Sequence, residues 1–246
     1  MNQEWVYGRQ AVREVFRAER RHVHLVRVAK GVQERGPLAE VLAVARRKDV
    51  RVEMVTRDVL DRLGGNHQGI AVQADEYPLV DFTELLTECE QAGPKALLLI
   101  LDQIQDPQNL ASLLRTAEAA AVTGVLLPFR RAAGITPAVV NASAGAVEHL
   151  HIAQSNLAQA MEELKRRGVW LAGLDAGPDA RPLFDADLTV PLAWVVGSEG
   201  EGLRTLVRKS CDVLYRLPMC GNIASLNAAV AGSIALYHTM YQRLNG

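Results

Sequence analysis

Short apolar runs along the chain alternate with segments in which apolar residues recur every three or four positions. Between residues 36 and 48 these positions are Leu38, Val41, Leu42 and Ala45, which would share one side of a helix. The runs that have the length of buried strands are at 23–29, 50–55 and 70–73. The first third of the chain therefore has the pattern of an α/β fold.

A less regular stretch follows. Residues 75–94 contain two prolines, several acids and one short helical pattern, which is typical of a linker or a connecting helix. Beyond it we expect strands at 96–101, 125–127, 169–174, 192–196 and 213–217, and helices at 109–122, 157–167, 202–209 and 226–243. Strands separated by helices indicate a mostly parallel sheet covered on both faces. The pattern predicts three parts: a small domain at 1–74, a linker at 75–94 and a larger domain at 95–246.

The charge is unevenly distributed between these parts. The formal net charge of the 246 residues is -1, but residues 1–74 hold 14 Lys or Arg against 9 Asp or Glu, and the remainder holds 13 against 19. A basic part joined to a mildly acidic one is compatible with a first part that binds phosphate and a second that carries the chemistry. Ordinary solvated charge explains the same counts equally well.

Membrane insertion and metal binding find no support in the sequence. No apolar run approaches the ~20 residues needed to cross a bilayer, and no secretory signal pattern is present, so we expect a cytoplasmic protein. Cys89, Cys211 and Cys220 lack the spacing of a zinc site or a redox pair, and we expect buried free thiols. The histidines show no ligand spacing either, so no metal is expected.

Three segments pass from an apolar strand through a polar turn into a helix, and three such turns would make one site. In the first, Asp106 is expected to cap a helix that has Pro107 at its first position. Arg115 follows among small and apolar neighbours, where a cation is costly unless it meets an anion. That anion is either an RNA phosphate or a carboxylate such as Glu118 or Glu199.

The second segment sends the strand at 192–196 into the loop Gly197-Ser-Glu199-Gly200-Glu-Gly202. Glycines let backbone N–H groups approach a ligand closely. The spacing differs from the dinucleotide fingerprint, and the chain has no P-loop motif, which disfavours a nucleotide-dependent enzyme of the Rossmann type. A tight turn with Glu199 as a helix cap explains the loop equally well.

The third segment runs from Leu217 through a Pro-Met-Cys-Gly turn into the last helix. Ser225 is expected to cap that helix, with Asn227 one turn in. The many small residues after Asn227 indicate close packing of another backbone, either a second subunit or a neighbour in the same domain.

In this order and at these separations, the three segments resemble motifs one, two and three of the SpoU (TrmH-type) RNA ribose 2'-O-methyltransferases, over roughly residues 97–240. The N-terminal part resembles the small L7Ae/L30e-like RNA-binding domain of the RlmB branch, through Val6-Tyr7-Gly8-Arg9-Gln10-Ala11-Val12 and His67-Gln68-Gly69. That branch modifies a guanosine of 23S ribosomal RNA. The resemblance implies methyl transfer from S-adenosylmethionine to a ribose 2'-hydroxyl of 23S rRNA, either naked or in a ribosome precursor.

The resemblance also implies a SPOUT domain whose C-terminal segment forms a trefoil knot, an exception to the rule that chains are unknotted. The knot would make the cofactor pocket, with backbone groups of Gly197, Leu217 and Leu226 binding the cofactor and Leu174 nearby. Members of the family form homodimers, and the small residues of the last helix are consistent with that.

The catalytic positions implied by the resemblance are Asn109, Arg115, Glu199, Ser225 and Asn227. Because a ribose hydroxyl is a weak acid, the transfer needs in-line alignment and help in removing the proton. Arg115 would bind phosphate near the target ribose and assist deprotonation, and the other four would position the ribose, the cofactor and one another. The resemblance leaves the proton acceptor open.

Three positions depart from the family pattern. Ala111 stands where motif one has Gly, and Ala228 and Ala229 stand where motif three has Val and Ser. The departures keep two alternatives open: the same chemistry on tRNA or another rRNA site, and a non-catalytic RNA-binding or ribosome-assembly protein.

Overall fold

The computed structural model describes residues 2–245 and divides into two compact units. The first unit combines the N-terminal segment up to Pro78 with residues 134–149, and the second holds the rest. A four-stranded sheet belongs to the first unit and a seven-stranded sheet to the second, within the described residues. The contacts of residues 134–149 with the first unit were not anticipated, and the three-part division stays a prediction.

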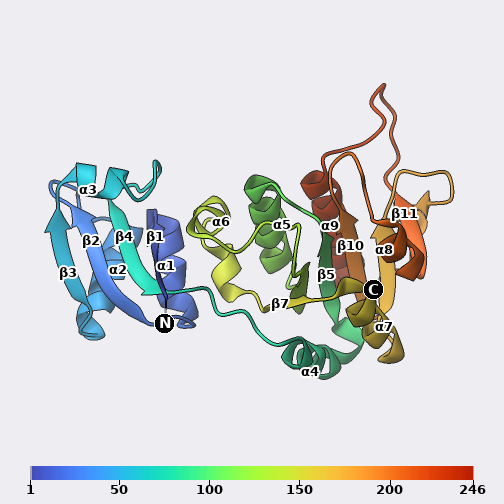
Figure 1. Ribbon diagram of the computed structural model, residues 1–246, viewed down its shortest axis with the longest axis horizontal. Coiled ribbons are helices and arrows are strands. Elements are labelled where there is room, and N and C mark those ends of the chain that lie inside the picture. The colour runs from blue at the N-terminus through green and yellow to red at the C-terminus, as the bar shows by residue number, and fades with distance from the viewer. Residues whose placement is uncertain (1, 246) are drawn as a thin grey trace. The chain divides into compact units, whose positions relative to one another are not determined.

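The first unit has strand order β1-β4-β2-β3, with only β2 and β3 parallel (Figure 1). Its elements are β1 (Gln3–Tyr7), α1 (Arg9–Ala18), β2 (Val23–Ala29), α2 (Pro37–Arg47), β3 (Arg51–Val55), α3 (Arg57–Asp61), β4 (Ile70–Asp75) and, from the later segment, α6 (Pro137–Ala142) and the short helix η2 (Ala146–His149). The predicted strands and helix of this part are confirmed. The prediction missed β1, α1, α3 and α6, although the buried residues of α1 recur at helical spacing.

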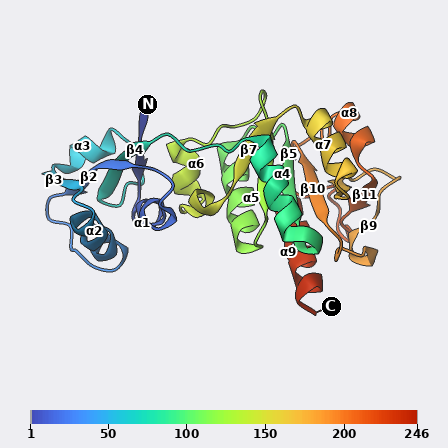
Figure 2. The same ribbon diagram turned by 90° about the horizontal axis from the view of Figure 1, so that it is seen from below.

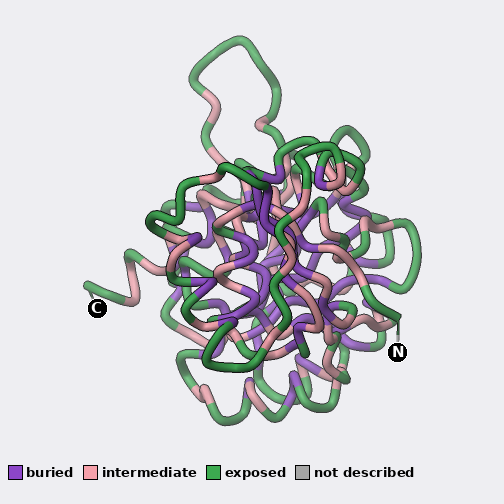
Figure 3. The backbone as a smooth tube through the Cα atoms, turned by 90° about the vertical axis from the view of Figure 1, so that its left-hand side faces the viewer, coloured by how far each residue is buried: buried purple, intermediate pink, exposed green. Residues whose placement is uncertain are grey.

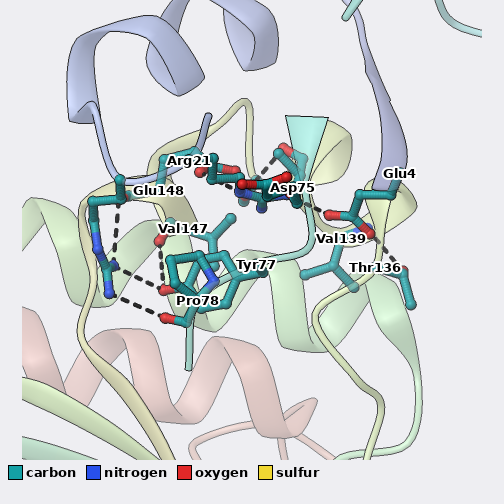
Figure 4. Close-up of polar contacts among 12 residues, drawn as sticks. Glu4, Arg21, Asp75, Tyr77, Pro78, Thr136, Val139, Val147 and Glu148 are labelled. Carbon is teal, nitrogen blue, oxygen red and sulfur yellow. Dashed lines mark hydrogen bonds and ion pairs between the residues drawn. The ribbon is translucent and has the colours of Figure 1, made fainter. Parts of the chain in front are cut away.

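A buried ion pair holds residues 134–149 in the first unit (Figure 4). Arg21 donates from Nε to Glu148 Oε2 at 2.9 Å and from Nη2 to Glu148 Oε1 at 2.7 Å, and its Nη1 contacts Glu4. The Arg21 side chain is fully buried and Glu148 is 1% exposed. Burial raises the pKa of Glu148, and Arg21 opposes that shift. A bidentate pair of this kind fixes both partners in orientation.

Tyr77 extends the same network. Its hydroxyl donates to the carbonyl oxygen of Val147 at 3.1 Å and accepts from Arg20 at 3.2 Å (Figure 4). Burial raises the pKa of Tyr77 to about 12, so the phenol stays protonated and can donate. On α6, the Asn141 amide donates to the Tyr7 carbonyl at 2.8 Å. Residues 134–149 are therefore bonded both to β1 and to the segment that follows β4.

The two short N-terminal signatures contact each other. The Arg9 backbone N–H donates to Gln68 Oε1 at 3.0 Å, and Arg9 Nε donates to the Gln68 carbonyl at 3.1 Å. His67 is buried, and its Nδ1 accepts from the Gly69 N–H at 3.0 Å. These residues hold the start of α1 against the loop that precedes β4. Both signatures therefore have a structural role in the first unit.

The second unit has strand order β7-β6-β5-β10-β8-β11-β9, and its paired strands are all parallel. Its elements are α4 (Phe82–Ala92), the short helix η1 (Gly93–Lys95), β5 (Leu97–Asp102), α5 (Pro107–Ala119), β6 (Gly124–Pro128), β7 (Ile152–Ser155), α7 (Leu157–Arg166), β8 (Trp170–Leu174), β9 (Arg181–Pro182), the short helix η3 (Leu183–Asp185), β10 (Leu192–Gly197), α8 (Thr205–Ser210), β11 (Val213–Arg216) and α9 (Ala228–Asn245). The predicted α/β fold with a mostly parallel sheet is confirmed. The short strands β7 and β9 were not predicted.

Helices cover both faces of this sheet (Figures 1 and 2). α4, α7 and α8 pack against one face of the sheet and form a hydrophobic core with it. Leu85, Leu86 and Cys89 of this core belong to α4, which lies in the region predicted to be a linker. α5 and α9 pack together on the other face, where Trp194 Nε1 donates to Thr239 at 2.9 Å. In Figure 3 the buried residues gather in the interior and the exposed ones in the loops.

The small residues of α9 pack within their own unit. A Cβ on Gly232 would lie 2.6 Å from a Leu113 methyl and 3.2 Å from Val196, so α9 approaches α5 and β10 closely. Ala229 and Ala235 are buried on the same helix. Of the two readings of this small surface, packing inside the domain is the one that the structure supports.

All three cysteines are free, but Cys220 is exposed, so the expectation of buried thiols is wrong for that residue. No helix among the described residues is long and apolar enough to span a membrane. The trefoil knot stays a prediction, because strand order alone does not establish threading.

Candidate functional site

The three polar turns lie at one edge of the second sheet. In the parallel pairing of β10 with β5, Gly197 is opposite Asp102. β5 pairs with β6 on its other side, and continuing that register by two residues brings Pro128 level with Asp102. The carboxyl ends of adjacent parallel strands therefore meet at this edge, which is where open α/β sheets bind ligands.

Asn109, Glu199 and Asn227 form a hydrogen-bonded cluster at this edge. Asn109 Nδ2 donates to Glu199 Oε1 at 2.9 Å, and Asn227 Nδ2 donates to Asn109 Oδ1 at 3.0 Å and also to Glu199 Oε1. Each of the three comes from a different motif. Glu199 Oε2 has no partner in the part of the chain that the structure describes, so it remains available to a ligand.

Two members of the cluster, Asn109 and Asn227, are positioned by helix caps. Asp106 accepts from the N–H groups of Gln108 at 3.1 Å and Asn109 at 3.4 Å, which confirms its predicted role at the start of α5. Asn227 Oδ1 accepts from Ala229 N at 2.8 Å and from Val230 N at 3.2 Å, so Asn227 caps α9. The expectation that Ser225 is the cap is wrong, because the helix begins only at Ala228.

Arg115 and Ser225 stand outside this cluster. Arg115 is exposed, and its side chain has no hydrogen bond or ion pair with any other residue between 2 and 245, so a pair with Glu118 or Glu199 is excluded. It follows Asn109 by six residues, which is about 240° around α5, so the two side chains leave different sides of the helix. Ser225 is exposed at the rim of the cavity described below.

A cavity of about 840 Å³ adjoins the cluster. Leu174, Gly197, Leu217 and Leu226, the four residues expected at the cofactor, all line it, as do Glu199 and Ser225. One wall is formed by residues 217–219 and 224–226. Residues 220–225 are exposed in a loop that projects beyond β10 and β11 (Figure 1). The structure thus places all four predicted cofactor residues around one space, together with Glu199 and Ser225 of the predicted catalytic residues.

The glycine loop after β10 is held tightly. Ser198 and Gly202 exchange backbone hydrogen bonds of 3.1 and 3.0 Å, and Gly202 has φ 67°. A Cβ on Gly197 would lie 2.3 Å from the carbonyl group of Gly202. Glu199 does not cap α8, whose N-cap is Arg204 without a side-chain bond. The alternative that the loop is a tight turn with Glu199 as the helix cap is therefore wrong.

Two polar contacts support the site and were not predicted. Asp102, fully buried at the end of β5, accepts from Arg204 N at 2.9 Å and from Arg204 Nε at 2.7 Å, which ties the glycine loop to β5. Asp175 accepts from Arg208 Nε at 2.8 Å beside the cavity, and this bond raises the pKa of Arg208. An acid at the last position of a buried strand is the sequence signal that marks Asp102. Between residues 2 and 245 no group of three or more His, Cys, Asp or Glu is placed to hold a metal.

Two family models match the chain. The model of the SpoU rRNA Methylase family matches residues 96–237, and a model described as RNA 2'-O ribose methyltransferase substrate binding matches residues 5–80. The first covers most of the unit that holds the cavity, together with residues 134–149 of the first unit, and the second covers most of the rest of the first unit. The resemblance seen in the three motifs is thereby confirmed.

Curated relatives and solved structures agree with these matches. The chain is 40% identical over 243 residues to the 23S rRNA (guanosine-2'-O-)-methyltransferase RlmB of Xylella fastidiosa, covering 98% of this chain and 97% of that protein. It is 38% identical to the protein of Bacillus subtilis that is named putative TrmH family tRNA/rRNA methyltransferase YacO, covering 98% of this chain and 96% of that protein. The crystal structure of the SpoU methyltransferase AviRb from Streptomyces viridochromogenes in complex with AdoMet shares the fold, with a TM-score of 0.83, 23% identity and coverage of 99% and 92%. The chain belongs to the SpoU family of RNA 2'-O-ribose methyltransferases.

Proposed function

We propose that the protein transfers a methyl group from S-adenosylmethionine to the ribose 2'-hydroxyl of a guanosine in 23S ribosomal RNA. The single observation that carries the catalytic part is the Asn109–Glu199–Asn227 cluster beside the cavity. The choice of guanosine and 23S rRNA is supported by the relative of that activity at 40% identity over nearly the whole chain. A ribosomal RNA substrate would place the protein in the cytoplasm.

The cavity fits the cofactor in size and in the character of its walls. Its volume of about 840 Å³ is within the 300–1,000 Å³ usual for small-molecule sites. The glycines of its wall expose backbone N–H and C=O groups, which can bind the polar parts of a nucleoside. Leu174, Leu217 and Leu226 supply apolar surface. When bound, S-adenosylmethionine supplies an electrophilic methyl group on a sulfonium sulfur.

The residues of the chain would hold the ribose and help to remove its proton. Asn109 and Asn227 fix Glu199, and its free Oε2 can accept a hydrogen bond from a sugar hydroxyl. Arg115, with no carboxylate partner, would bind the adjacent phosphate and stabilise the developing alkoxide by its charge. Ser225 at the cavity rim would contribute a further hydrogen bond. Positioning of this kind lowers the barrier by replacing a chance encounter with a fixed geometry.

We also propose a homodimer that forms through the outer side of α9. Val230, Tyr237, Tyr241 and Leu244 are exposed and recur at intervals of seven, four and three residues, which places them in one stripe along the helix. Figure 2 shows the last turns of α9 extending beyond the sheet. A second copy would bury this apolar stripe, whereas the small residues of α9 are already packed inside the unit.

The transfer itself is tested with radiolabelled S-adenosylmethionine. The purified protein is incubated separately with 23S rRNA, 16S rRNA and bulk tRNA, and the label is mapped to the nucleotide and to the ribose oxygen. We expect label on one guanosine 2'-oxygen of 23S rRNA. Label only on tRNA would keep the chemistry and overturn the substrate. No label on any RNA or on ribosome precursors, together with no cofactor binding, would favour the non-catalytic RNA-binding protein.

Substitution of Gly197 tests the cofactor site. In Gly197→Ala the new Cβ would collide with backbone atoms of Gly202, which cannot move without displacing the glycine loop. We expect the Kd for S-adenosylmethionine, measured by isothermal titration calorimetry, to rise at least about 10-fold, which is about 1.4 kcal/mol. Gly221→Ala is the matched control, because a Cβ there meets nothing within 4 Å. Equal Kd values for the two variants would show that the loop does not bind the cofactor.

A further inference from the structure

The loop after β6 carries an exposed aromatic residue next to two unpaired cations. Phe129 is 67% exposed, and Arg130 and Arg131 are exposed beside it. Neither guanidinium has a hydrogen bond or an ion pair in the part of the chain that the structure describes, whereas Arg204 and Arg208 in the same unit bind carboxylates. We refer to residues 129–133 as the β6 loop. It lies wholly in the second unit.

The β6 loop is beside the proposed site, on the side away from the cavity. The strands follow one another as β6, β5, β10 and β8, so the loop after β6 neighbours the loop after β5, which leads to Asn109. The Ala133 N–H donates to the Ile104 carbonyl at 2.8 Å and joins the two loops directly. The cavity is lined from β8, β10 and β11. Along the edge of the sheet the order is therefore cavity, cluster and β6 loop.

The backbone of the β6 loop is held in a defined conformation. Arg131 has φ 60°, which is uncommon for a residue with a long side chain and requires support from the surrounding structure. The hydrogen bond from Ala133 to Ile104 provides such support two residues later. The loop thus presents its three exposed side chains from a fixed turn.

We propose that Phe129 stacks on an unpaired base of the RNA next to the target ribose, and that Arg130 and Arg131 bind the flanking phosphates. This inference rests on the proposed function, because the methyl group would come from the cavity side and the nucleotide from the other side of the cluster. Aromatic rings and cations in one groove are the features by which proteins bind single-stranded nucleic acid, since every base offers a face for stacking and every nucleotide a phosphate. A base of the RNA would cover the exposed ring of Phe129, and its phosphates would pair with Arg130 and Arg131.

The experiment compares RNA binding by Phe129→Ala, Phe129→Trp and Arg131→Ala, with deproteinised 23S rRNA as the probe in filter-binding titrations over a range of salt concentrations. Trp170→Ala is the matched control, because Trp170 is 51% exposed but begins β8, at the opposite edge of the same sheet. We expect Phe129→Ala to weaken RNA binding about 10- to 100-fold, as for the loss of one stacked base, and Phe129→Trp to bind like the unmodified protein. Arg131→Ala should reduce the slope of log K against log salt by about 0.7 to 0.9. The Kd for S-adenosylmethionine should stay the same in all variants.

Several outcomes would overturn this assignment. Phe129→Ala binding RNA as tightly as Trp170→Ala would show that the ring does not contact RNA. A smaller sedimentation coefficient for Phe129→Ala than for Trp170→Ala would assign the ring to a contact between copies of the chain. Failure of the proposed function has a separate signature: RNA binding would depend on Phe129 while the unmodified protein transferred no methyl group.

Discussion

Arg115→Ala should slow methyl transfer about 10²- to 10⁴-fold and leave the Kd for S-adenosylmethionine unchanged. Arg115 is the exposed cation of α5, and it has no partner in the described part of the chain that would explain its presence structurally. Removing it takes away the charge that would bind phosphate and stabilise the ribose alkoxide. The rate constant is measured in single turnover with saturating cofactor and RNA, and cofactor binding by calorimetry.

Two further variants sharpen this test. Arg115→Lys keeps the charge but loses the planar fork of donors, so we expect a rate between those of the unmodified protein and Arg115→Ala. Arg166→Ala is the control, because Arg166 is an exposed arginine on α7 whose ion pairs, among residues 2–245, are with Glu162 and Glu163 of its own helix. Full turnover by Arg115→Ala with normal cofactor binding would remove Arg115 from the catalytic residues.

Arg21→Ala should lower the free energy of unfolding of the first unit by about 3–5 kcal/mol, because it leaves the buried carboxylate of Glu148 without its cation. Glu4 loses the same partner. The change is measured by urea denaturation followed by circular dichroism. Hydrogen exchange of β4 and of residues 134–149 assigns the loss to the first unit.

The surface control is again Arg166→Ala, which removes the ion pairs of a 66% exposed arginine with Glu162 and Glu163, and it should cost under about 1 kcal/mol. A double variant, Arg21→Met with Glu148→Leu, replaces the pair by apolar groups and should recover part of the stability. A cost for Arg21→Ala no larger than that of Arg166→Ala would mean that residues 134–149 are not held by this pair.

The departures from the family pattern can be judged from the positions of the three alanines. Ala111 is buried in α5, and Ala229 is buried in α9, where its backbone N–H binds the capping Asn227. Ala228 lines the cavity. None of the three interrupts the hydrogen bonds among Asn109, Glu199 and Asn227. The geometry of the cluster is therefore compatible with an active enzyme.

The sequence by itself determined those features that depend on neighbouring residues. The apolar run of β5 and the Asp106-Pro107 start of α5 were predicted correctly, because a buried strand and a side-chain cap are fixed within a few residues. The three motifs also indicated the family, since each motif is a short run of residues that can be recognised in the chain itself. The local pattern of α1 was sufficient as well, but the prediction overlooked it.

Tertiary structure decided the rest. Both Ser225 and Asn227 are residue types that can cap a helix, and in the structure Asn227 is the cap. Its side chain also forms hydrogen bonds with Asn109 and Glu199, which come from distant parts of the chain. The partner of Arg21 lies more than a hundred residues away, so no local pattern could have shown that residues 134–149 belong to the first unit. The β6 loop could be proposed as an RNA contact only because the order of the strands places it beside the loop that leads to Asn109. Hydrogen bonds and ion pairs between distant segments depend on how the folded backbone brings those segments together. The short-range periodicity of the sequence does not contain that information.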